Sequence, residues 1–350
     1  MSDPVHFVLR TSLALIALAL LVTAQERKVV KVFVLAGQSN MEGKAQNELL
    51  ESQAKDQKTA ELFAHLRKDG HWIVRDDVFV KFLERKGGLT IGYGSPDRTG
   101  VELEFGWVLG DHFEEPVLLI KTAWGGHSLF RNFRPPSAGL PSDEKLADEL
   151  ERAQKRVTEQ NEKNKRQDPL PKMEEIEAAY GKSYRDMIAE VHDVLAHMGS
   201  LFPELKGREP LLSGLVWHQG WNDQYEGAET EYASNMRHLI DDFRKEFDTP
   251  KLPVVVAVMG QNGSKPAKGA MKVIQDAQLA MNEVPFVRAV RTDELVDRAA
   301  EELYPTWKEH QEQWKLVGSD HGYHYLGSAI WHLRMGHAFG EAMLALIDPK

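Results

Sequence analysis

Five segments of the chain are almost uninterrupted runs of apolar residues, and helical patterns lie between them. Such runs are typical of strands that are buried on both faces, as in a parallel sheet. The predicted strands are residues 29–36, 117–122, 214–218, 253–259 and 286–291. The predicted helices include residues 47–66, 184–197, 230–247 and 328–346. This alternation predicts an α/β domain with a central parallel sheet and right-handed crossovers.

Residues 135–182 interrupt the alternation. They begin with two prolines and a serine, and residues 143–165 are dense in Glu, Lys, Arg and Gln. This composition predicts a solvated helix or helical hairpin, inserted between the second predicted strand and a later helix. Two interpretations stay open for this charged helical insertion: a surface elaboration and a lid over a substrate.

The N-terminal apolar run is preceded by Arg10 and ends in small residues at positions 22–24. This is the pattern of a secretory signal peptide, and the run is too short for a comfortable membrane span. We therefore expect residues 1–24 to be removed and residues 25–350 to form the folded domain of a secreted or periplasmic protein. The alternative is an uncleaved N-terminal anchor. No other segment reaches spanning length, so we expect no membrane association after cleavage.

The composition excludes several classes of site. The chain has 350 residues, with 43 Lys and Arg against 53 Asp and Glu, for a net charge of −10. Binding to nucleic acid requires an excess of positive charge, so we expect no nucleic-acid partner. The absence of cysteine excludes disulfides, thiolate–zinc sites and cysteine nucleophiles.

The first candidate for chemistry directly follows the first predicted strand, in the segment Gly37-Gln38-Ser39-Asn40-Met41-Glu42-Gly43. A small, polar, glycine-flanked segment after a buried strand predicts a tight turn into a helix. Such a turn exposes the Ser39 hydroxyl and leaves backbone N–H groups free at the helix N-terminus. Ser39 is then a candidate nucleophile, provided that a base takes its proton and donors bind the oxyanion. The alternative is that Ser39 only caps the helix.

The next two predicted strands also end in polar, glycine-containing segments. The paired glycines Gly125 and Gly126 allow close approach of the backbone to a ligand, and a free N–H here would suit an oxyanion hole; an ordinary turn is the alternative. The third strand runs into Trp217-His218-Gln219-Gly220-Trp221-Asn222-Asp223, where an amide side chain could bind an oxyanion or act as a structural hydrogen-bonder. Because ligands of parallel sheets bind beyond the carboxyl ends of strands, we expect these segments to meet.

Near the C-terminus, His321 and His324 closely follow Asp320. A histidine placed after an acid can be oriented through one ring nitrogen while the other faces a serine. A structural histidine is the alternative. His332 and His337 lie further along, but the spacing of the four histidines matches no defined zinc signature, and we expect no metal.

Together, the Gly37–Met41 segment, the Gly125-Gly126 turn, the Trp217–Gly220 segment and His324 resemble the SGNH-type esterases. The resemblance is to the sialate O-acetylesterase-like group, which includes the acetylxylan esterases of carbohydrate esterase family six. It spans most of the chain after residue 24, with the segments in the family's order. It implies a three-layer, flavodoxin-like α/β/α sandwich and removal of acetyl groups from sugar hydroxyls without metal or other cofactor.

The resemblance also implies roles by position. Ser39 would be the nucleophile and His324 the general base. The oxyanion donors would be the Ser39 and Gly126 backbone N–H groups and the Gln219 side chain. Asn222 is the alternative to Gln219, because residues 220–223 also resemble the superfamily's G-x-N-D block.

The acid departs from the family pattern. The superfamily usually has Asp three residues before the histidine, where this chain has His321, and Asp320 lies four before. Many relatives carry Glu directly after W-H-Q-G, where this chain has Trp221. We favour Asp320 as the acid that orients His324, with Asp223 as the alternative. A dyad, in which a backbone carbonyl orients the histidine, also stays open.

We therefore expect an exported serine esterase that removes O-acetyl groups from carbohydrates through an acyl-enzyme. Trp124, Trp221, Tyr225 and Tyr323 lie near the predicted strand ends, where they would stack on sugar rings or pack against the protein. One alternative is a noncatalytic carbohydrate-binding protein with a degenerate triad, which the altered acid positions favour. Another is a histidine-metal hydrolase. The identity of the acetylated sugar and the oligomeric state do not follow from the sequence.

Overall fold

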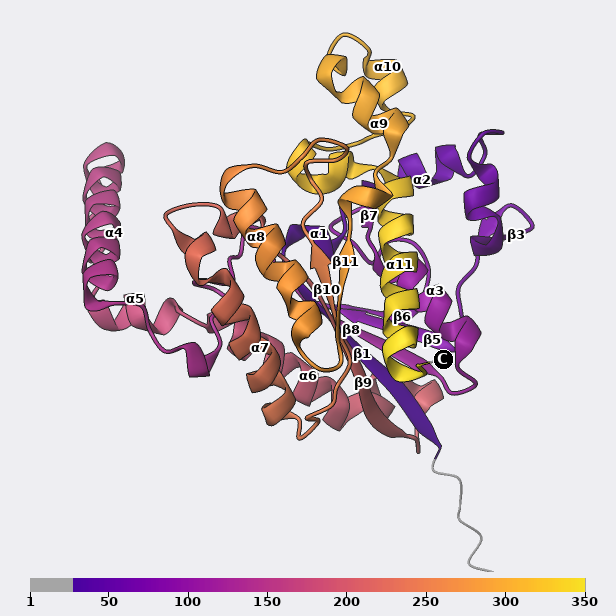
Figure 1. Cartoon of the computed structure of the whole chain (residues 1–350), viewed down its shortest axis with the longest axis horizontal. Helices are drawn as coiled ribbons and strands as arrows, with labels where there is room; N and C mark the ends of the chain where they lie inside the picture. The colour runs from indigo at the N-terminus through magenta and orange to yellow at the C-terminus, as the bar shows by residue number, and fades with distance from the viewer. Residues whose placement is uncertain (1–27, 350) are drawn as a thin grey trace, which may run out of the picture.

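A seven-stranded sheet organises the part of the chain, residues 28–349, that the computed structural model describes (Figure 1). The strand order is β11-β10-β9-β1-β8-β5-β6. The strands are β1 (Val29–Gly37), β5 (Val78–Phe82), β6 (Arg85–Gly88), β8 (Val117–Ala123), β9 (Glu209–His218), β10 (Val254–Val258) and β11 (Val287–Arg291). Neighbouring strands are parallel except at one edge, where β6 runs antiparallel to β5. The predicted α/β class with a central, mostly parallel sheet is confirmed.

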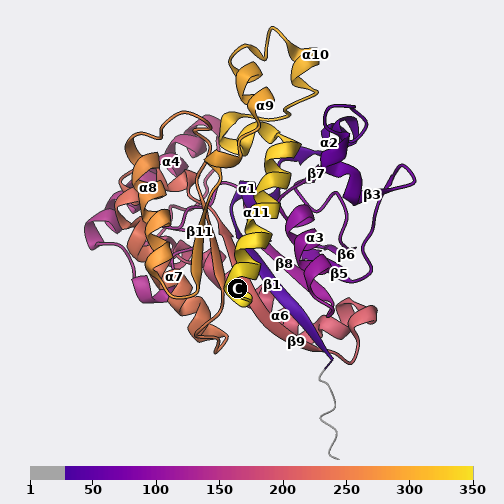
Figure 2. The same cartoon turned by 45° about the vertical axis from the view of Figure 1, so that its right-hand side comes forward.

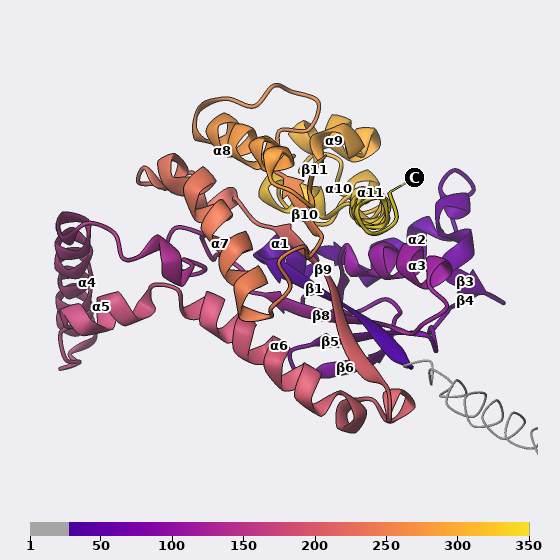
Figure 3. The same cartoon turned by 60° about the horizontal axis from the view of Figure 1, so that its bottom comes forward.

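Helices cover both faces of the sheet (Figures 1 and 3). The helices α3 (Glu102–His112) and α11 (Ala329–Ile347) pack on one face, and α6 (Lys182–Leu201), α7 (Tyr232–Glu246) and α8 (Gly269–Leu279) pack on the other. Successive side chains of β1 alternate between these two cores: Phe33 and Leu35 join the first, and Val32 and Val34 the second. Burial on both faces explains why β1 is a continuous apolar run, and the three-layer sandwich is confirmed.

The remaining elements are short or lie outside the sandwich. They are α1 (Ser39–Glu42), α2 (Asn47–Gln53), α4 (Asp143–Asn164), α5 (Met173–Ala179), α9 (Arg298–Leu303), α10 (Gln311–Trp314), and the strands β2 (Ala45–Gln46), β3 (Arg67–Lys68), β4 (His71–Trp72) and β7 (Arg98–Thr99). β2 pairs with β7, and β3 pairs with β4, both antiparallel. The pairing of β2 with β7 brings Arg98 close to the segment that follows β1.

Two predicted elements differ from the structure. The helix predicted over residues 47–66 ends at Gln53, and a 3₁₀ helix covers Ala60–Leu66. The segment between them is polar, and its side chains bond to the backbone: the Thr59 hydroxyl donates to the Gln53 carbonyl. Such local bonds compete with a continuous helix. The strand predicted from residue 214 begins earlier, at Glu209. The prediction missed its first five residues because they are exposed or partly exposed and do not form an apolar run.

The helices α4 and α5 fall within residues 135–182 and project from the sandwich (Figures 1 and 3); in the view of Figure 2, α4 is behind α8. The Ser142 side chain caps α4 by accepting a hydrogen bond from the Lys145 N–H. Leu146 of α4 packs with Ile176 and Tyr180 in a small apolar cluster. This cluster is separate from the two cores of the sandwich.

The signal peptide predicted for residues 1–24 lies outside the described residues. Between residues 28 and 349, no helix combines the length and the apolar character needed to cross a membrane.

Candidate active site

Ser39 lies where β1 turns abruptly into α1. The last residue of β1, Gly37, has a φ of +153°, and a Cβ built on it would lie 2.2 Å from the His218 carbonyl oxygen at the end of β9. Only glycine fits this approach of the two strands. Ser39 is the first residue of α1, so its backbone N–H has no acceptor within the helix.

His324 comes from the opposite end of the chain, and its Nε2 lies 3.0 Å from Ser39 Oγ. The next residue, Tyr325, is completely buried and fixes the loop over the strand ends. Its hydroxyl lies 2.9 Å from Thr292 Oγ1, after β11, and accepts a hydrogen bond from the Gly260 N–H, after β10. The histidine is therefore held at the carboxyl edge of the sheet by its neighbour in sequence.

The other ring nitrogen of His324 faces Asp320. Nδ1 lies 3.1 Å from Oδ1, an ion-pair distance whose angle falls short of a good hydrogen bond. Arg98 donates to Oδ2 at 2.5 Å, and the His321 N–H donates to Oδ1 at 2.7 Å. Partial burial alone would raise the pKa of Asp320, but His324, the His321 N–H and Arg98 together hold that pKa well below its usual range. Asp320 is thus a carboxylate beside the imidazole.

Asp223 has a different environment. It is completely buried, and its two oxygens accept hydrogen bonds from the Leu129 N–H at 2.8 Å, the Phe130 N–H at 2.7 Å and Gln219 Nε2 at 2.6 Å. Burial raises the pKa of Asp223 to about 6, although these donors oppose the shift. Asp223 thus joins the loop after β9 to the loop after β8, and these bonds give it no contact with His324.

The Gln219 side-chain NH₂ group donates both of its hydrogen bonds to acceptors within the protein. Its Nε2 donates to Asp223 and, at 3.1 Å, to the His127 carbonyl. Since an amide has two N–H donors, neither is left for a ligand in this arrangement.

Asn222 is oriented by the neighbour of Ser39. The Gly220 N–H donates to Gln38 Oε1 at 3.1 Å, which turns the Gln38 NH₂ toward Asn222. That NH₂ donates to Asn222 Oδ1 at 2.9 Å. With its oxygen occupied, Asn222 presents its own NH₂ group, which has no acceptor within residues 28–349. Of the two amides predicted as oxyanion donors, Asn222 is therefore the one with free N–H groups.

The Gly125-Gly126 turn lies against Ser39. A Cβ built on Gly125 would sit 3.6 Å from Ser39 Cβ. Glu42 Oε1 accepts a hydrogen bond from the Gly125 N–H at 2.6 Å, which fixes the turn. Gly126 has a φ of +79° and is exposed, and its N–H makes no hydrogen bond in the described part of the chain. Two backbone N–H groups and one side-chain amide thus remain unpaired around Ser39.

The predicted aromatic residues differ in position. The rings of Trp221 and Tyr323 lie 6.0 Å apart, and Tyr323 also contacts His324 edge to face at 4.5 Å. Trp124 is half-buried against Phe133, with ring centroids 5.7 Å apart. Tyr225 is 56% exposed. Trp221 and Tyr323 therefore adjoin the Ser39–His324 pair, whereas Trp124 mainly packs on the sheet.

The histidines near the C-terminus do not converge. Across residues 28–349, no three His, Asp or Glu side chains are arranged to hold a metal ion. His332 is buried, with Nδ1 2.8 Å from the Ser328 carbonyl, and His337 lies 3.2 Å from Glu104. His321 instead stacks on Tyr323, at 5.3 Å between ring centroids.

Three side chains that support the site were not predicted: Gln38, Glu42 and Arg98. Gln38 and Glu42 belong to the segment singled out around Ser39, so polar residues beside a candidate nucleophile were the available signal. Arg98 carries no such signal, because it reaches Asp320 only through the pairing of β2 with β7.

One solved structure supports the fold, and two others were found with lower similarity. An Arabidopsis thaliana protein superposes with a TM-score of 0.52 at 15% sequence identity, over 91% of this chain and 98% of that one. A carbohydrate acetylesterase from Xanthomonas citri superposes with a TM-score of 0.48 at 14% sequence identity, over 91% of this chain and 57% of that one. NanS superposes with a TM-score of 0.41 at 11% sequence identity, over 76% of this chain and 78% of NanS. No protein among those with curated functions matches the sequence.

A family profile matches most of the chain, over residues 29–166 and 171–307. The match includes Ser39, Gly126 and Asn222 and ends before Asp320 and His324. Its description is a carbohydrate esterase, sialic acid-specific acetylesterase. The chain therefore belongs to the sialic acid-specific acetylesterase family of carbohydrate esterases.

Proposed function

We propose that this protein is an exported serine esterase that hydrolyses O-acetyl groups on carbohydrates through an acyl-enzyme. Family membership supports the esterase class and the acetylated carbohydrate substrate. The observation that carries the mechanism is the 3.0 Å distance between Ser39 Oγ and His324 Nε2. These two residues are 285 positions apart in the sequence. Export rests on the N-terminal sequence alone, and N-terminal sequencing of the mature protein tests it.

In the first half-reaction, His324 Nε2 takes the Ser39 proton while Oγ attacks the acetyl carbonyl carbon. The carbonyl oxygen becomes an oxyanion, which the Ser39 and Gly126 N–H groups and the Asn222 amide bind. Collapse of this intermediate breaks the bond to the sugar oxygen, and His324 returns the proton to that oxygen. The products are the free sugar hydroxyl and acetyl-Ser39.

In the second half-reaction, His324 takes a proton from water, and the resulting nucleophile attacks the acetyl-enzyme. Collapse releases acetic acid and restores the Ser39 hydroxyl. In both halves the imidazole becomes positively charged, and the Asp320 carboxylate beside Nδ1 stabilises that charge. The Asp320 carboxylate, which lies 3.1 Å from the imidazole despite the shifted position of this acid in the sequence, supports a catalytic protein over a noncatalytic one.

The direct test replaces Ser39 by Ala and measures hydrolysis of 4-nitrophenyl acetate and of an acetylated sugar. We expect kcat to fall by about 10⁴-fold or more. In the wild type, a fluorophosphonate should label Ser39, as identified by peptide mass spectrometry. Turnover of Ser39→Ala at the wild-type rate would overturn the proposal.

A further inference from the structure

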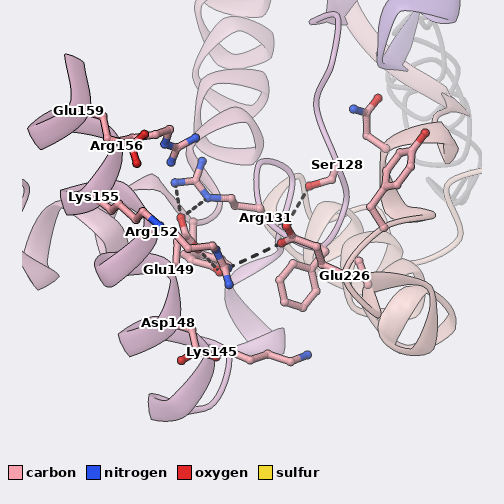
Figure 4. Close-up of a pocket in the computed structure, with 15 residues that line it drawn as sticks. Ser128, Arg131, Lys145, Asp148, Glu149, Arg152, Lys155, Arg156, Glu159 and Glu226 are labelled. Carbon is pink, nitrogen blue, oxygen red and sulfur yellow. Dashed lines mark hydrogen bonds and ion pairs between the residues drawn. The ribbon is translucent and has the colours of Figure 1, made fainter. Parts of the chain in front are cut away.

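A cleft of about 990 Å³ lies between α4 and the loops that follow β8 and β9 (Figure 4). One wall consists of α4 side chains that recur at helical spacing between Lys145 and Glu159. The other wall includes Ser128, Asn222 and Tyr225. Ligand pockets usually measure roughly 300–1,000 Å³, so this one, here called the α4 cleft, is large enough for a ligand of several rings.

The α4 cleft adjoins the candidate active site at Asn222, whereas Ser39 and His324 do not line it. Asn222 lines it, and the same side chain is bonded to Gln38, the neighbour of Ser39. Ser128 lines it two residues after Gly126. A substrate whose acetyl group lies at Ser39 would therefore extend into this cleft.

Ion pairs hold part of the cleft wall in place. Arg131 Nη2 lies 2.6 Å from Glu149 Oε1, and Lys145 Nζ lies 3.0 Å from Glu231 Oε1. Figure 4 marks the ion pair between Arg131 and Glu149 with a dashed line. Arg152 of α4 lies 3.7 Å from Glu226 on the opposite wall. These pairs fix the approach of α4 to the body of the protein.

Four further charged side chains line the cleft without any hydrogen bond or ion pair in residues 28–349: Asp148, Lys155, Arg156 and Glu159. Two are cationic and two anionic. They offer donors and acceptors in equal number, as a sugar hydroxyl requires, because it both donates and accepts. A strongly anionic or cationic ligand would instead meet like charges from one of the two pairs.

Aromatic rings complete the lining. Phe130 is already covered, by Arg134 at 5.1 Å and Lys145 at 4.9 Å from its centroid. The Tyr180 hydroxyl is bonded to Glu149 at 2.7 Å. Tyr225 is 56% exposed and has no ring partner in the described structure, so its face is available to the apolar face of a sugar.

We propose that the α4 cleft binds the sugar units that flank the acetylated residue in a neutral oligosaccharide. This inference rests on the esterase function proposed above and deepens it. It assigns the α4–α5 insertion a role in selecting substrates by chain length.

The test measures kcat/KM for 4-nitrophenyl acetate and for acetylated neutral β-linked oligosaccharides of one to six units. For the longer oligosaccharides, we expect Tyr225→Ala and the double variant K155A/R156A to lose about five- to twentyfold. For 4-nitrophenyl acetate and the acetylated monosaccharide, both variants should stay within about twofold of the wild type. Lys163→Ala, an exposed cation of α4 outside the cleft lining, is the matched control and should behave like the wild type.

Three results would overturn the proposal: no gain in kcat/KM beyond one sugar unit, equal losses on 4-nitrophenyl acetate, or a preference for sulfated or uronate oligosaccharides. If the wild type hydrolyses no acetyl ester, the esterase proposal itself fails. Calorimetry with the unacetylated neutral hexasaccharides then decides the α4 cleft separately. Binding that Tyr225→Ala abolishes supports it, and no binding by the wild type refutes it.

Discussion

Two acid-bearing loops at the same edge of the sheet show how environment divides similar residues between structure and chemistry. The loop after β9 carries Asp223, which is completely buried and has a pKa raised to about 6 by that burial. The loop before α11 carries Asp320, which is partly exposed and whose pKa is held low by His324, the His321 N–H and Arg98. One carboxyl group ties two loops together; the other faces a histidine.

Of the substitutions in these two loops, we expect Asp320→Asn to have the largest effect on kcat. If Asp320 has the proposed role, Asp320→Asn removes the charge that stabilises the imidazolium, so we expect kcat on 4-nitrophenyl acetate to fall by about 10²- to 10⁴-fold. The thermal midpoint should also fall, because the charged carboxylate that Arg98 and the His321 N–H stabilise is lost, so kcat is compared below the onset of unfolding. Arg98→Gln, which keeps the carboxylate, is the control and should lose much less. Retention of more than a tenth of the wild-type kcat in Asp320→Asn would point to a dyad.

In the proposed mechanism the loop after β9 also contributes chemistry, through Asn222 rather than Asp223. Asn222→Ala removes one proposed oxyanion donor, and we expect kcat to fall by about 10²- to 10³-fold with little change in KM. Gln38→Leu should give a smaller loss, of about tenfold, because it leaves the donor in place but no longer orients it. Equal kcat values for Gln38→Leu and the wild type would remove Gln38 from this role.

The smallest effect on activity is expected for Asp223. Asp223→Asn replaces one of the two acceptor oxygens by an NH₂ group, which leaves either the Leu129 or the Phe130 N–H without its acceptor, so the free energy of unfolding should fall by about 1–3 kcal/mol. The kcat of the folded variant should stay within about tenfold of the wild type. Urea unfolding, together with kcat measured in the folded range, separates the two quantities. A kcat loss as large as that of Asp320→Asn, without lost stability, would reverse the assigned roles.

The same variant has a pH signature. Because burial raises the pKa of Asp223 from 3.8 to about 6, the folded protein keeps this proton between about pH 4 and 6, where the unfolded chain loses it. The contribution of Asp223 to stability is therefore greatest near pH 4, falls through this window by about 2–3 kcal/mol, and is constant above it. The difference in unfolding free energy between wild type and Asp223→Asn should narrow from pH 4 to pH 7. A difference that widens over this range would contradict the raised pKa.

The sequence predicted five adjacent strands of the sheet, and the prediction was clearest for β1 and β10, because burial on both faces leaves a continuous apolar run. It missed the edge strand β6 and its neighbour β5, which contain charged or glycine residues such as Lys81 and Gly87. It also missed α3, whose first turn buries Glu102. Short or partly polar elements acquire their structure from packing partners that no local pattern reveals.

For the candidate site too, local sequence predicted some residues, whereas others depend on contacts between distant segments. Ser39 and His324 were predicted from local segments and a family resemblance, and the structure brings the two side chains together. The choice between Gln219 and Asn222 could not be made from sequence. It depends on which amide NH₂ group is already hydrogen-bonded within the protein, as that of Gln219 is. The partner of Asp320 was equally hidden, since Arg98 approaches it across 222 residues.

The three residues after His324 have a consequence for how the site is assembled. Tyr325, Leu326 and Gly327 all have positive φ, between 51° and 61°, and they lead directly into α11, the final helix. The imidazole can meet the serine only after this helix has docked on α3 and on the strands β10 and β11, whereas Ser39 follows β1, the first strand of the sheet to be synthesised. Ester hydrolysis by this chain would thus report completion of folding, and a polypeptide still lacking its last helix would be inert even with its nucleophile already formed.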